Sequence, residues 1–193
     1  MVEVTASFMK RKGLILTNIN NFQQPLIIKA PSYTDDRGIM MKMASASSFD
    51  TRFEQINITS NFAKGVFRGL HMTSACDETK IIKCHKGDIA DYCLDLRLGS
   101  STFLSCFTFY LSESDDQTLF IPPGYAHGVE ALSGNSEFIY CSDIPYKPLN
   151  ELVVNVDDPL IKWSSKKPTD IIRSKKDINA PFLNAEFRGL KCL

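Results

Sequence analysis

The sequence predicts an all-β fold, a sandwich or barrel with only a few short helices, and three observations support this class. Short segments rich in β-branched and aromatic residues recur along the chain, turn-forming clusters separate them at intervals of about a dozen residues, and helical patterns are scarce. A chain of 193 residues is long enough for one well-filled core. We therefore expect a single domain over residues 1–193, with its core at about 32–165 and a more polar segment at about 166–193 that packs on the core or trails from it.

Four segments are predicted as strands because apolar, β-branched and aromatic residues dominate them. They are residues 81–84, 89–96, 103–111 and 137–141. Turns are predicted where glycine, proline and small polar residues gather between apolar segments. These clusters are residues 86–88, 98–100, 122–124 and 133–135. Only two stretches have a helical pattern, 46–53 and 170–177.

Composition narrows the class of partner. The chain carries 22 basic and 22 acidic residues, so its formal net charge is zero. A protein that binds nucleic acid by neutralising phosphates usually has a basic excess, and we therefore expect no nucleic-acid partner, although a local basic pocket for one diphosphate is compatible. No run approaches the roughly 20 apolar residues that span a bilayer, so we expect no membrane partner and a cytoplasmic location.

The six cysteines contain no Cys-x-x-Cys pair and lie in or beside apolar segments. Reduced cysteine behaves as a small apolar residue, and disulfides are rare in cytosolic proteins. We therefore expect buried free thiols.

Part of the sequence fits the metal-binding pattern of the small β-barrels called cupins. His71 follows a glycine with the expected spacing, Glu78 stands near the position of the carboxylate ligand, and Pro122-x-Gly-x-x-His127 fits the second half of the pattern. The pattern requires His-x-His, but Thr73 replaces its second histidine. Two imidazoles and one carboxylate remain for a divalent ion that prefers three or four protein ligands. A metal-dependent cupin enzyme using His71, Glu78 and His127 is thus an alternative, and the favoured hypothesis has no metal and no cofactor.

The same strands carry side chains that suit proton transfer next to a carbonyl group. His71 is a candidate base, Tyr140 a candidate acid, and Lys80 a cation able to stabilise an enolate oxygen. Each of these residues alone is more often a hydrogen-bonded interior side chain or part of the core. Together, and with Asp177 available to orient the base, they indicate chemistry.

A longer series of motifs runs in a fixed order from about Ser32 to Pro181, nearly the whole domain. The series is Asp36-Arg37-Gly38, Gln55-x-Asn57, Gly65-Val66-x-Arg68-Gly69-Leu70-His71, Lys80, Asp95-Leu96-Arg97, Ser101-Thr102-Phe103, Ile121-Pro122-x-Gly124-x-Ala126-His127-Gly128, Glu137-Phe138-x-Tyr140, Tyr146, Trp163 and Ser174-Lys175-Lys176-Asp177. In this order the motifs resemble the dTDP-4-dehydrorhamnose 3,5-epimerase family. Arg-Gly-Leu-His with a downstream Ala-His-Gly is specific in combination.

The resemblance implies a dimeric jelly-roll cupin that epimerises C3 and C5 of a nucleotide-linked 4-keto-6-deoxyhexose without a metal. His71 would be the base with Asp177 as its partner, and Tyr140 would be the acid on the opposite face of the sugar ring. Lys80 would face the C4 enolate oxygen. Arg37, Gln55, Asn57 and Arg68 would bind the diphosphate and nucleoside. His127 would lie near the sugar or phosphate, and Tyr146 would stack on the nucleobase.

Departures from the family pattern leave the substrate open. Met72-Thr73 replace residues that the family usually has after the histidine, and Val129 replaces a phenylalanine. Residues 39–42 are Ile-Met-Met-Lys, whereas the family commonly has aromatic residues and a glutamate that meet the nucleobase. A lysine cannot accept a hydrogen bond from the base as a carboxylate does. The sequence therefore leaves open the nucleoside (dTDP, GDP, CDP or UDP) and the sugar.

Three related functions fit the same residues. A single-centre 3- or 5-epimerase and a keto-isomerase begin from the same enolate as a 3,5-epimerase, so the sequence does not separate them. A non-catalytic sugar-nucleotide-binding cupin would keep the fold without the reaction. We expect a cofactor-independent epimerase that acts as a homodimer on a nucleotide-diphospho-sugar, in deoxysugar biosynthesis for an envelope polysaccharide or a glycosylated natural product.

Overall fold

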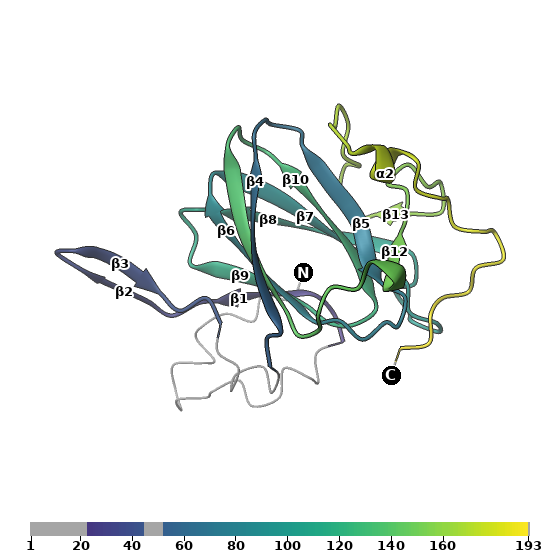
Figure 1. Cartoon of the computed structure of the whole chain (residues 1–193), viewed down its shortest axis with the longest axis horizontal. Helices are drawn as coiled ribbons and strands as arrows, with labels where there is room; N and C mark the ends of the chain where they lie inside the picture. The colour runs from purple at the N-terminus through teal and green to yellow at the C-terminus, as the bar shows by residue number, and fades with distance from the viewer. Residues whose placement is uncertain (1–22, 45–51, 193) are drawn as a thin grey trace.

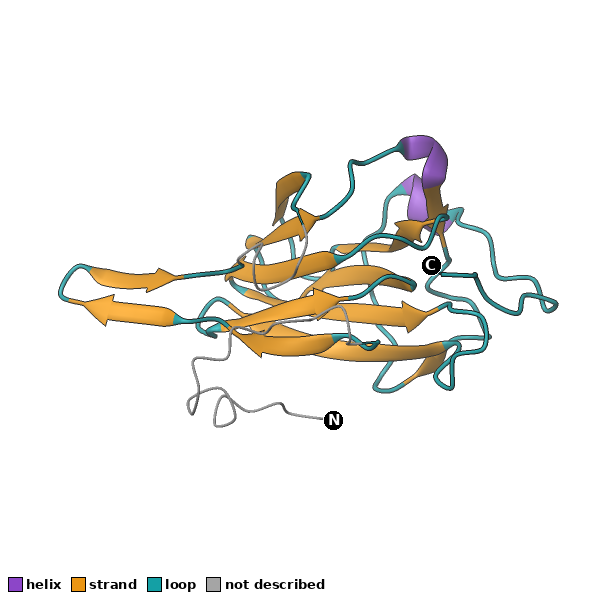
Figure 2. Cartoon of the chain, turned by 90° about the horizontal axis from the view of Figure 1, so that it is seen from below, coloured by secondary structure: helices purple, strands orange, loops and turns teal. Residues whose placement is uncertain are grey.

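The computed structural model describes residues 23–44 and 52–192, and in this part of the chain two sheets pack face to face (Figure 1, Figure 2). The five-stranded sheet consists, in spatial order, of β1 (Leu26–Lys29), β9 (Gln117–Ile121), β6 (Lys80–Lys86), β11 (Ser136–Ser142) and β4 (Gln55–Asn61). The six-stranded sheet consists of β12 (Glu151–Val153), β5 (Phe67–Thr73), β10 (Tyr125–Ala131), β7 (Asp88–Asp95), β8 (Ser105–Ser112) and β13 (Lys162–Trp163). The predicted all-β sandwich is confirmed.

The four predicted turn clusters lie between consecutive strands, as expected from their glycine and proline content. The predicted strands are also present, although the strand expected at 103–111 begins only at Ser105 in β8. A further hairpin, β2 (Ser32–Asp35) and β3 (Gly38–Met41), projects from the body of the molecule (Figure 1). No residue of this hairpin is buried.

Helices are few and short in the described residues: a 3-10 helix, η2 (Pro148–Asn150), and an α-helix, α2 (Lys175–Ile178). The helix predicted at 170–177 is wrong in extent, because Ile172 forms a parallel bridge with Val66 and α2 begins only after Ser174. Most of the helix predicted at 46–53 lies outside the described residues, and residues 52 and 53 are not helical. Within the described residues, no helix is long and apolar enough to cross a bilayer.

Alternation along the strands creates three buried apolar clusters in the described residues, and the two largest form layers against the six-stranded sheet. One layer fills the space between the sheets and includes Ile82, Leu119, Ile121, Val129 and Phe138. The other packs the six-stranded sheet against the C-terminal part of the chain and includes Leu70, Leu94, Leu96, Val154 and Val156. The C-terminal segment is therefore held over this sheet, and the remaining space between the sheets is free for polar side chains.

The expectation of six free thiols is wrong for two cysteines. Cys76, in the turn between β5 and β6, forms a disulfide with Cys192, 116 residues away. The other four cysteines are buried free thiols, as expected. Leu190 supports the same tether, because its backbone exchanges hydrogen bonds with Leu96 and Leu98. Sequence spacing did not reveal the disulfide, since the fold alone brings these distant cysteines together.

Strand β5 is irregular where it pairs with β10. His71 lies opposite His127 and Arg68 lies opposite Val129, so three steps along β5 match two steps along β10. Residues three apart in a regular strand point to opposite faces, but the extra residue of this bulge brings Arg68 and His71 to the same side of the sheet.

The bulge depends on a glycine at position 69. Gly69 has a φ of +128°, which L side chains rarely adopt. A Cβ atom at this position would lie 2.5 Å from the Cα of Gly128 and 2.7 Å from the carbonyl oxygen of His127. These are backbone atoms of β10, so no side-chain movement would relieve the contact.

We predict that Gly69→Ala destabilises the fold for two reasons. The new methyl group forces β5 away from β10, and the alanine must adopt a positive φ, which is strained for an L side chain. The free energy of unfolding, measured in urea, should fall by at least about 2 kcal/mol. Gly134→Ala is the matched control, since no atom lies within 4 Å of its added Cβ. Its effect should stay within about 0.5 kcal/mol. Equal effects of the two substitutions would show that the close approach at Gly69 is not structurally important.

We also predict that Cys192→Ser lowers the melting temperature by roughly 5–15 °C, since a disulfide typically contributes about 2–4 kcal/mol by restricting the unfolded chain. A reductant should lower the melting temperature of the unsubstituted protein by a similar amount and leave that of the variant unchanged. A variant as stable as the unsubstituted protein would contradict a stabilising role for the tether.

Candidate active site

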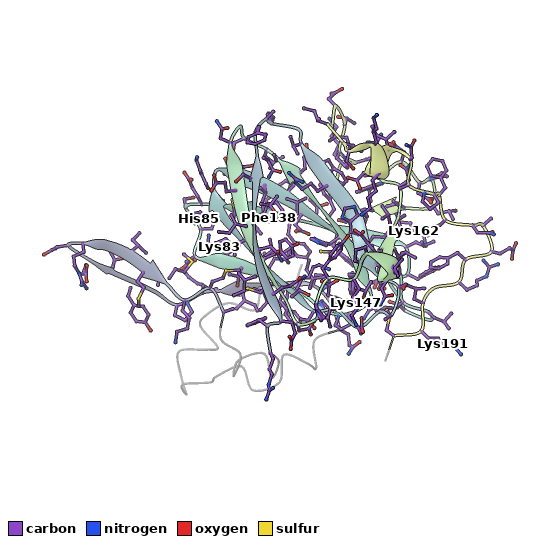
Figure 3. All side chains as sticks on the ribbon, in the orientation of Figure 1. Lys83, His85, Phe138, Lys147, Lys162 and Lys191 are labelled. Carbon is purple, nitrogen blue, oxygen red and sulfur yellow. A yellow bond between two sulfur atoms is a disulfide. The ribbon has the colours of Figure 1, made fainter. Side chains whose placement is uncertain are left out.

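A cavity of about 510 Å³ lies between the two sheets, and residues from both sheets, from the β11–β12 loop and from the C-terminal segment line it. Eight of the predicted site residues are among them: Gln55, Arg68, His71, Lys80, His127, Tyr140, Tyr146 and Asp177. Two others, Asn57 and Arg37, are not. Phe138 and Lys147, both labelled in Figure 3, also line the cavity.

The side chain of Asp177 holds the imidazole of His71. Ser174 is the N-cap of helix α2: its hydroxyl accepts a hydrogen bond from the Asp177 N–H at 3.1 Å, and this cap orients the carboxylate. Asp177 Oδ1 lies 2.7 Å from His71 Nε2. Burial alone would raise the pKa of Asp177, but the hydrogen bond and charge of His71, with the Ser174 hydroxyl, hold this pKa below its ordinary value.

A second carboxylate flanks the same imidazole. Glu151 Oε1 lies 3.7 Å from His71 Nδ1, and Glu151 Oε2 accepts hydrogen bonds from the Tyr146 hydroxyl at 3.0 Å and from the Lys176 ammonium. Burial would raise the pKa of Glu151, but its bonds with Lys176 and Tyr146 lower it. Sequence reasoning missed Glu151 and did not single out Lys176. No local motif marks Glu151. It comes near His71 through the pairing of β12 with β5, which places Glu151 opposite Thr73.

Lys80 and Tyr140 share one face of the opposing sheet. Lys80 pairs with Ser142 in the β6–β11 ladder, and Tyr140 is two residues before Ser142, so both side chains point into the cavity. Lys80 is 8% exposed and forms an ion pair with Glu78, which also accepts a hydrogen bond from the Ser142 hydroxyl at 2.8 Å. The site therefore holds a buried cation in a fixed position.

Tyr140 is suited to donate a proton. Burial raises its pKa, and the nearby carboxylates of Glu78 and Glu151 add to this effect, while Arg68 opposes it. The phenol therefore stays protonated at neutral pH. Since His71 belongs to the six-stranded sheet and Tyr140 to the five-stranded sheet, the candidate base and the candidate acid face each other across one cavity.

His127 lies beside His71, opposite it in the β5–β10 ladder. Its Nδ1 atom is 3.5 Å from Asp91 Oδ2, which is long for a hydrogen bond, and both atoms are buried without a hydrogen-bond partner in the described part of the chain. Asp91 itself is fully buried. The second predicted histidine therefore lies next to the candidate base and has an unused polar atom.

The arginine and asparagine side chains expected to bind the nucleotide do not all line the cavity. Arg68 donates to the side-chain oxygen of Asn61 at 3.0 Å and to the Ser60 carbonyl at 3.3 Å, so its hydrogen-bond partners are uncharged. The Nδ2 atom of Asn57 is buried and has no partner among the described residues. Arg37 instead lies on the projecting β2–β3 hairpin, paired with Asp35 at 2.6 Å, and the structure does not bring it to this chain's cavity (Figure 1).

The residues of the metal-dependent alternative do not form a cluster. In the described part of the chain, no group of three His, Cys, Asp or Glu side chains is arranged to hold a metal ion. Glu78, the proposed carboxylate ligand, is ion-paired with Lys80 on the opposing sheet. The arrangement instead offers a base held by one carboxylate, a buried cation and a protonated phenol, which suits removal and return of a proton on carbon.

Known proteins share this sequence and fold. A model of the dTDP-4-dehydrorhamnose 3,5-epimerase family matches residues 20–185. The dTDP-4-dehydrorhamnose 3,5-epimerase of Methanothermobacter thermautotrophicus is 35% identical over 162 residues, which cover 80% of this chain and 86% of that protein. The enzyme of the same name from Shigella flexneri is 31% identical over 172 residues, covering 84% and 93% of the two chains.

Solved structures agree with these relatives. The structure of a dTDP-6-deoxy-D-glucose-3,5-epimerase from Legionella pneumophila, in complex with dTDP-4-keto-L-rhamnose, has a TM-score of 0.78 at 29% identity and covers 88% of this chain and 95% of that one. The dTDP-4-dehydrorhamnose 3,5-epimerase of Elizabethkingia anophelis gives 0.75 at 30% identity, covering 86% and 95%. The sandwich is thus of the cupin type found in these enzymes. The chain belongs to the dTDP-4-dehydrorhamnose 3,5-epimerase family and is an epimerase, a member of the isomerase class.

Proposed function

We propose that the chain epimerises a nucleotide-linked 4-keto-6-deoxy sugar at C3, at C5 or at both, through an enolate and with no cofactor in the chemical step. The observation that carries this proposal is the placement of His71 and Tyr140 on facing sheets of one cavity, with Lys80 beside Tyr140. The Legionella structure supports the substrate class, because its ligand is dTDP-4-keto-L-rhamnose. The proposal includes a cytoplasmic location.

The reaction begins at His71. With its Nε2–H donated to Asp177, the imidazole carries its lone pair on Nδ1, which takes the proton from the carbon next to the C4 ketone. The electron pair of the broken C–H bond forms a C=C bond, and the carbonyl electrons move to the C4 oxygen. The Lys80 ammonium stabilises this enolate oxygen, and Glu78 keeps Lys80 in place.

Tyr140 completes the inversion. Its phenol gives a proton to the same carbon from the opposite face of the ring, and the enolate returns to the ketone. The tyrosinate then takes a proton from solvent. The substrate gains and loses no electrons, and its carbon exchanges one hydrogen with the solvent. The same two side chains serve C3 and C5, since both carbons are adjacent to the C4 ketone.

Unpaired cations at the cavity suit the diphosphate. Of the basic residues that line it, Arg68 and Lys147 have no carboxylate within ion-pair distance in the described part of the chain. A nucleotide diphosphate supplies two negative charges that would balance them. The remaining binding roles are those expected from the family resemblance. Gln55 and Asn57 lie near the diphosphate and nucleoside, His127 lies near the sugar or phosphate, and Tyr146 stacks on the nucleobase.

A second copy of the chain is the proposed partner. β4 is an edge strand in which Ile56 and Ile58 are exposed on the outer face, while Gln55, Asn57 and Thr59 are less exposed and face inward. The hairpin adds Ile39 and Met40, which are also exposed. Covering these apolar side chains in a homodimer would remove them from water. It would also explain Arg37, which does not reach the cavity of its own chain and would serve that of the second copy.

We predict that His71→Asn slows exchange of the substrate's C3 and C5 hydrogens with deuterated water by about a hundredfold or more, because an amide cannot take the proton as the imidazole does. The exchange is followed by NMR. His85→Asn is the matched control, since His85 is exposed and does not line this cavity (Figure 3). Tyr140→Phe should retain part of the exchange and suppress inversion. Full activity in His71→Asn would overturn the assignment, and tight binding of the sugar nucleotide without exchange by the unsubstituted protein would indicate a non-catalytic module.

We predict a pH-dependent effect of Asp177→Asn on stability. Since the pKa of Asp177 is lower in the folded protein than in the unfolded chain, its ionisation stabilises the fold above about pH 4, and this contribution is lost as the pH falls through the folded-state value. The free energy of unfolding should differ between the unsubstituted protein and the variant by about 1–3 kcal/mol at pH 7. Urea unfolding should show the same difference at pH 7 and pH 5 and a smaller one at pH 3. A difference that stays constant over this range would mean that the Asp177 charge does not stabilise the fold.

A further inference from the structure

Each inversion in the proposed mechanism leaves one proton too many on His71. The base takes a proton from one face of the sugar, and Tyr140 supplies a different proton to the other face. Before the next cycle, or before the second centre reacts, the imidazolium must therefore lose its proton. Nε2 is not a route to solvent, because it faces Asp177, which is only 3% exposed. The remaining ring nitrogen, Nδ1, must both take the proton from carbon and pass it on.

Glu151 is the carboxylate placed at this nitrogen. Its Oε1 atom lies 3.7 Å from His71 Nδ1, and its side chain is only 14% exposed. This separation is slightly longer than a hydrogen bond. Once His71 is protonated, its positive charge attracts the carboxylate, so a small side-chain movement suffices for contact.

The other oxygen of Glu151 faces the outside. Oε2 accepts hydrogen bonds from the Tyr146 hydroxyl and the Lys176 ammonium, and both of these residues are well exposed, with fractions of 59% for Tyr146 and 50% for the Lys176 side chain. These bonds hold the carboxylate between the partly buried imidazole and the cavity rim. A proton received on Glu151 can therefore pass to water at the rim.

The backbone keeps Glu151 in this position. It begins strand β12 and pairs with Thr73, two residues beyond His71 on β5, while Val153 pairs with His71 itself. The preceding loop is attached to the end of β5 by the hydrogen bond from the Ser74 N–H to the Asn150 carbonyl at 2.7 Å. The carboxylate and the imidazole thus belong to adjacent strands of one sheet.

We propose that Glu151 is the proton-return residue of the active site: it accepts the proton that His71 has taken from the sugar carbon and releases it to solvent beside Tyr146 and Lys176. This inference rests on the proposed function, since it requires His71 to be the base. In this step the N–H bond of the imidazolium breaks and an O–H bond forms on Glu151, which then loses the same proton to water. His71 returns to its neutral form and no other reactant is needed.

The test is Glu151→Gln, which keeps the size and hydrogen-bonding ability of the side chain and removes its ability to carry the proton. With enzyme in excess over a 4-keto-6-deoxy sugar nucleotide, the first proton abstraction should stay within about twofold of the unsubstituted rate, because this step comes before any proton has to leave His71. Steady-state turnover should fall about tenfold or more. Added imidazole buffer should restore turnover in proportion to its concentration, since it carries the proton in place of the carboxylate. Glu186→Gln is the control, because the Glu186 side chain is exposed and does not line the cavity.

Two outcomes would overturn the proposal. Unchanged steady-state turnover in Glu151→Gln would show that the proton leaves by another route. An equal loss in the first abstraction and in turnover, with no restoration by buffer, would mean that Glu151 only positions His71 or the substrate. If Glu151→Gln does not fold, Glu151→Asp offers the same readouts, because its shorter carboxylate widens the gap to Nδ1 and should slow turnover in a buffer-dependent way. Neither outcome bears on His71→Asn, whose loss of exchange tests the base separately.

Discussion

The hydrogen bond between His71 Nε2 and Asp177 Oδ1 is the interaction on which the site depends. It joins the bulged strand β5 to a four-residue helix in the C-terminal segment, 106 positions away in the sequence. In the proposed mechanism, this bond orients the ring and directs the lone pair of Nδ1 into the cavity. Without a carboxylate at this position, the imidazole would be free to rotate and the base would lose its direction.

The distance between the two sheets is the second constraint, because it places the His71 side chain and the Tyr140 side chain on opposite sides of one cavity. A sandwich places side chains of its two inner faces across a gap of about 10 Å when apolar residues fill it. Here polar residues replace the apolar ones on β4, β5, β6 and β11, so the gap becomes a cavity with the proposed base on one wall and the proposed acid on the other. Opposed walls are what an inversion at carbon requires, since the proton leaves one face and returns to the other.

The sequence was informative where local chemistry decides structure. Turn clusters such as 86–88 and 133–135 and the β-branched segments between them predicted the sandwich, and the Arg-Gly-Leu-His and Ala-His-Gly motifs predicted residues that line the cavity. It was uninformative where tertiary pairing decides. Glu151 reaches His71 only through the register of β12 on β5, Cys76 meets Cys192 only through the path of the C-terminal segment, and Ile172 leaves the predicted helix because it bridges to Val66.

The central claim is that the base and the acid act on opposite faces of one sugar ring. The most direct measurement is a crystal structure of the inactive His71→Asn variant with a bound 4-keto-6-deoxy sugar nucleotide. We expect the ring between position 71 and Tyr140, with its C4 oxygen at the Lys80 ammonium. A ring bound with Tyr140 and position 71 on the same face, or with its C4 oxygen away from Lys80, would contradict the account.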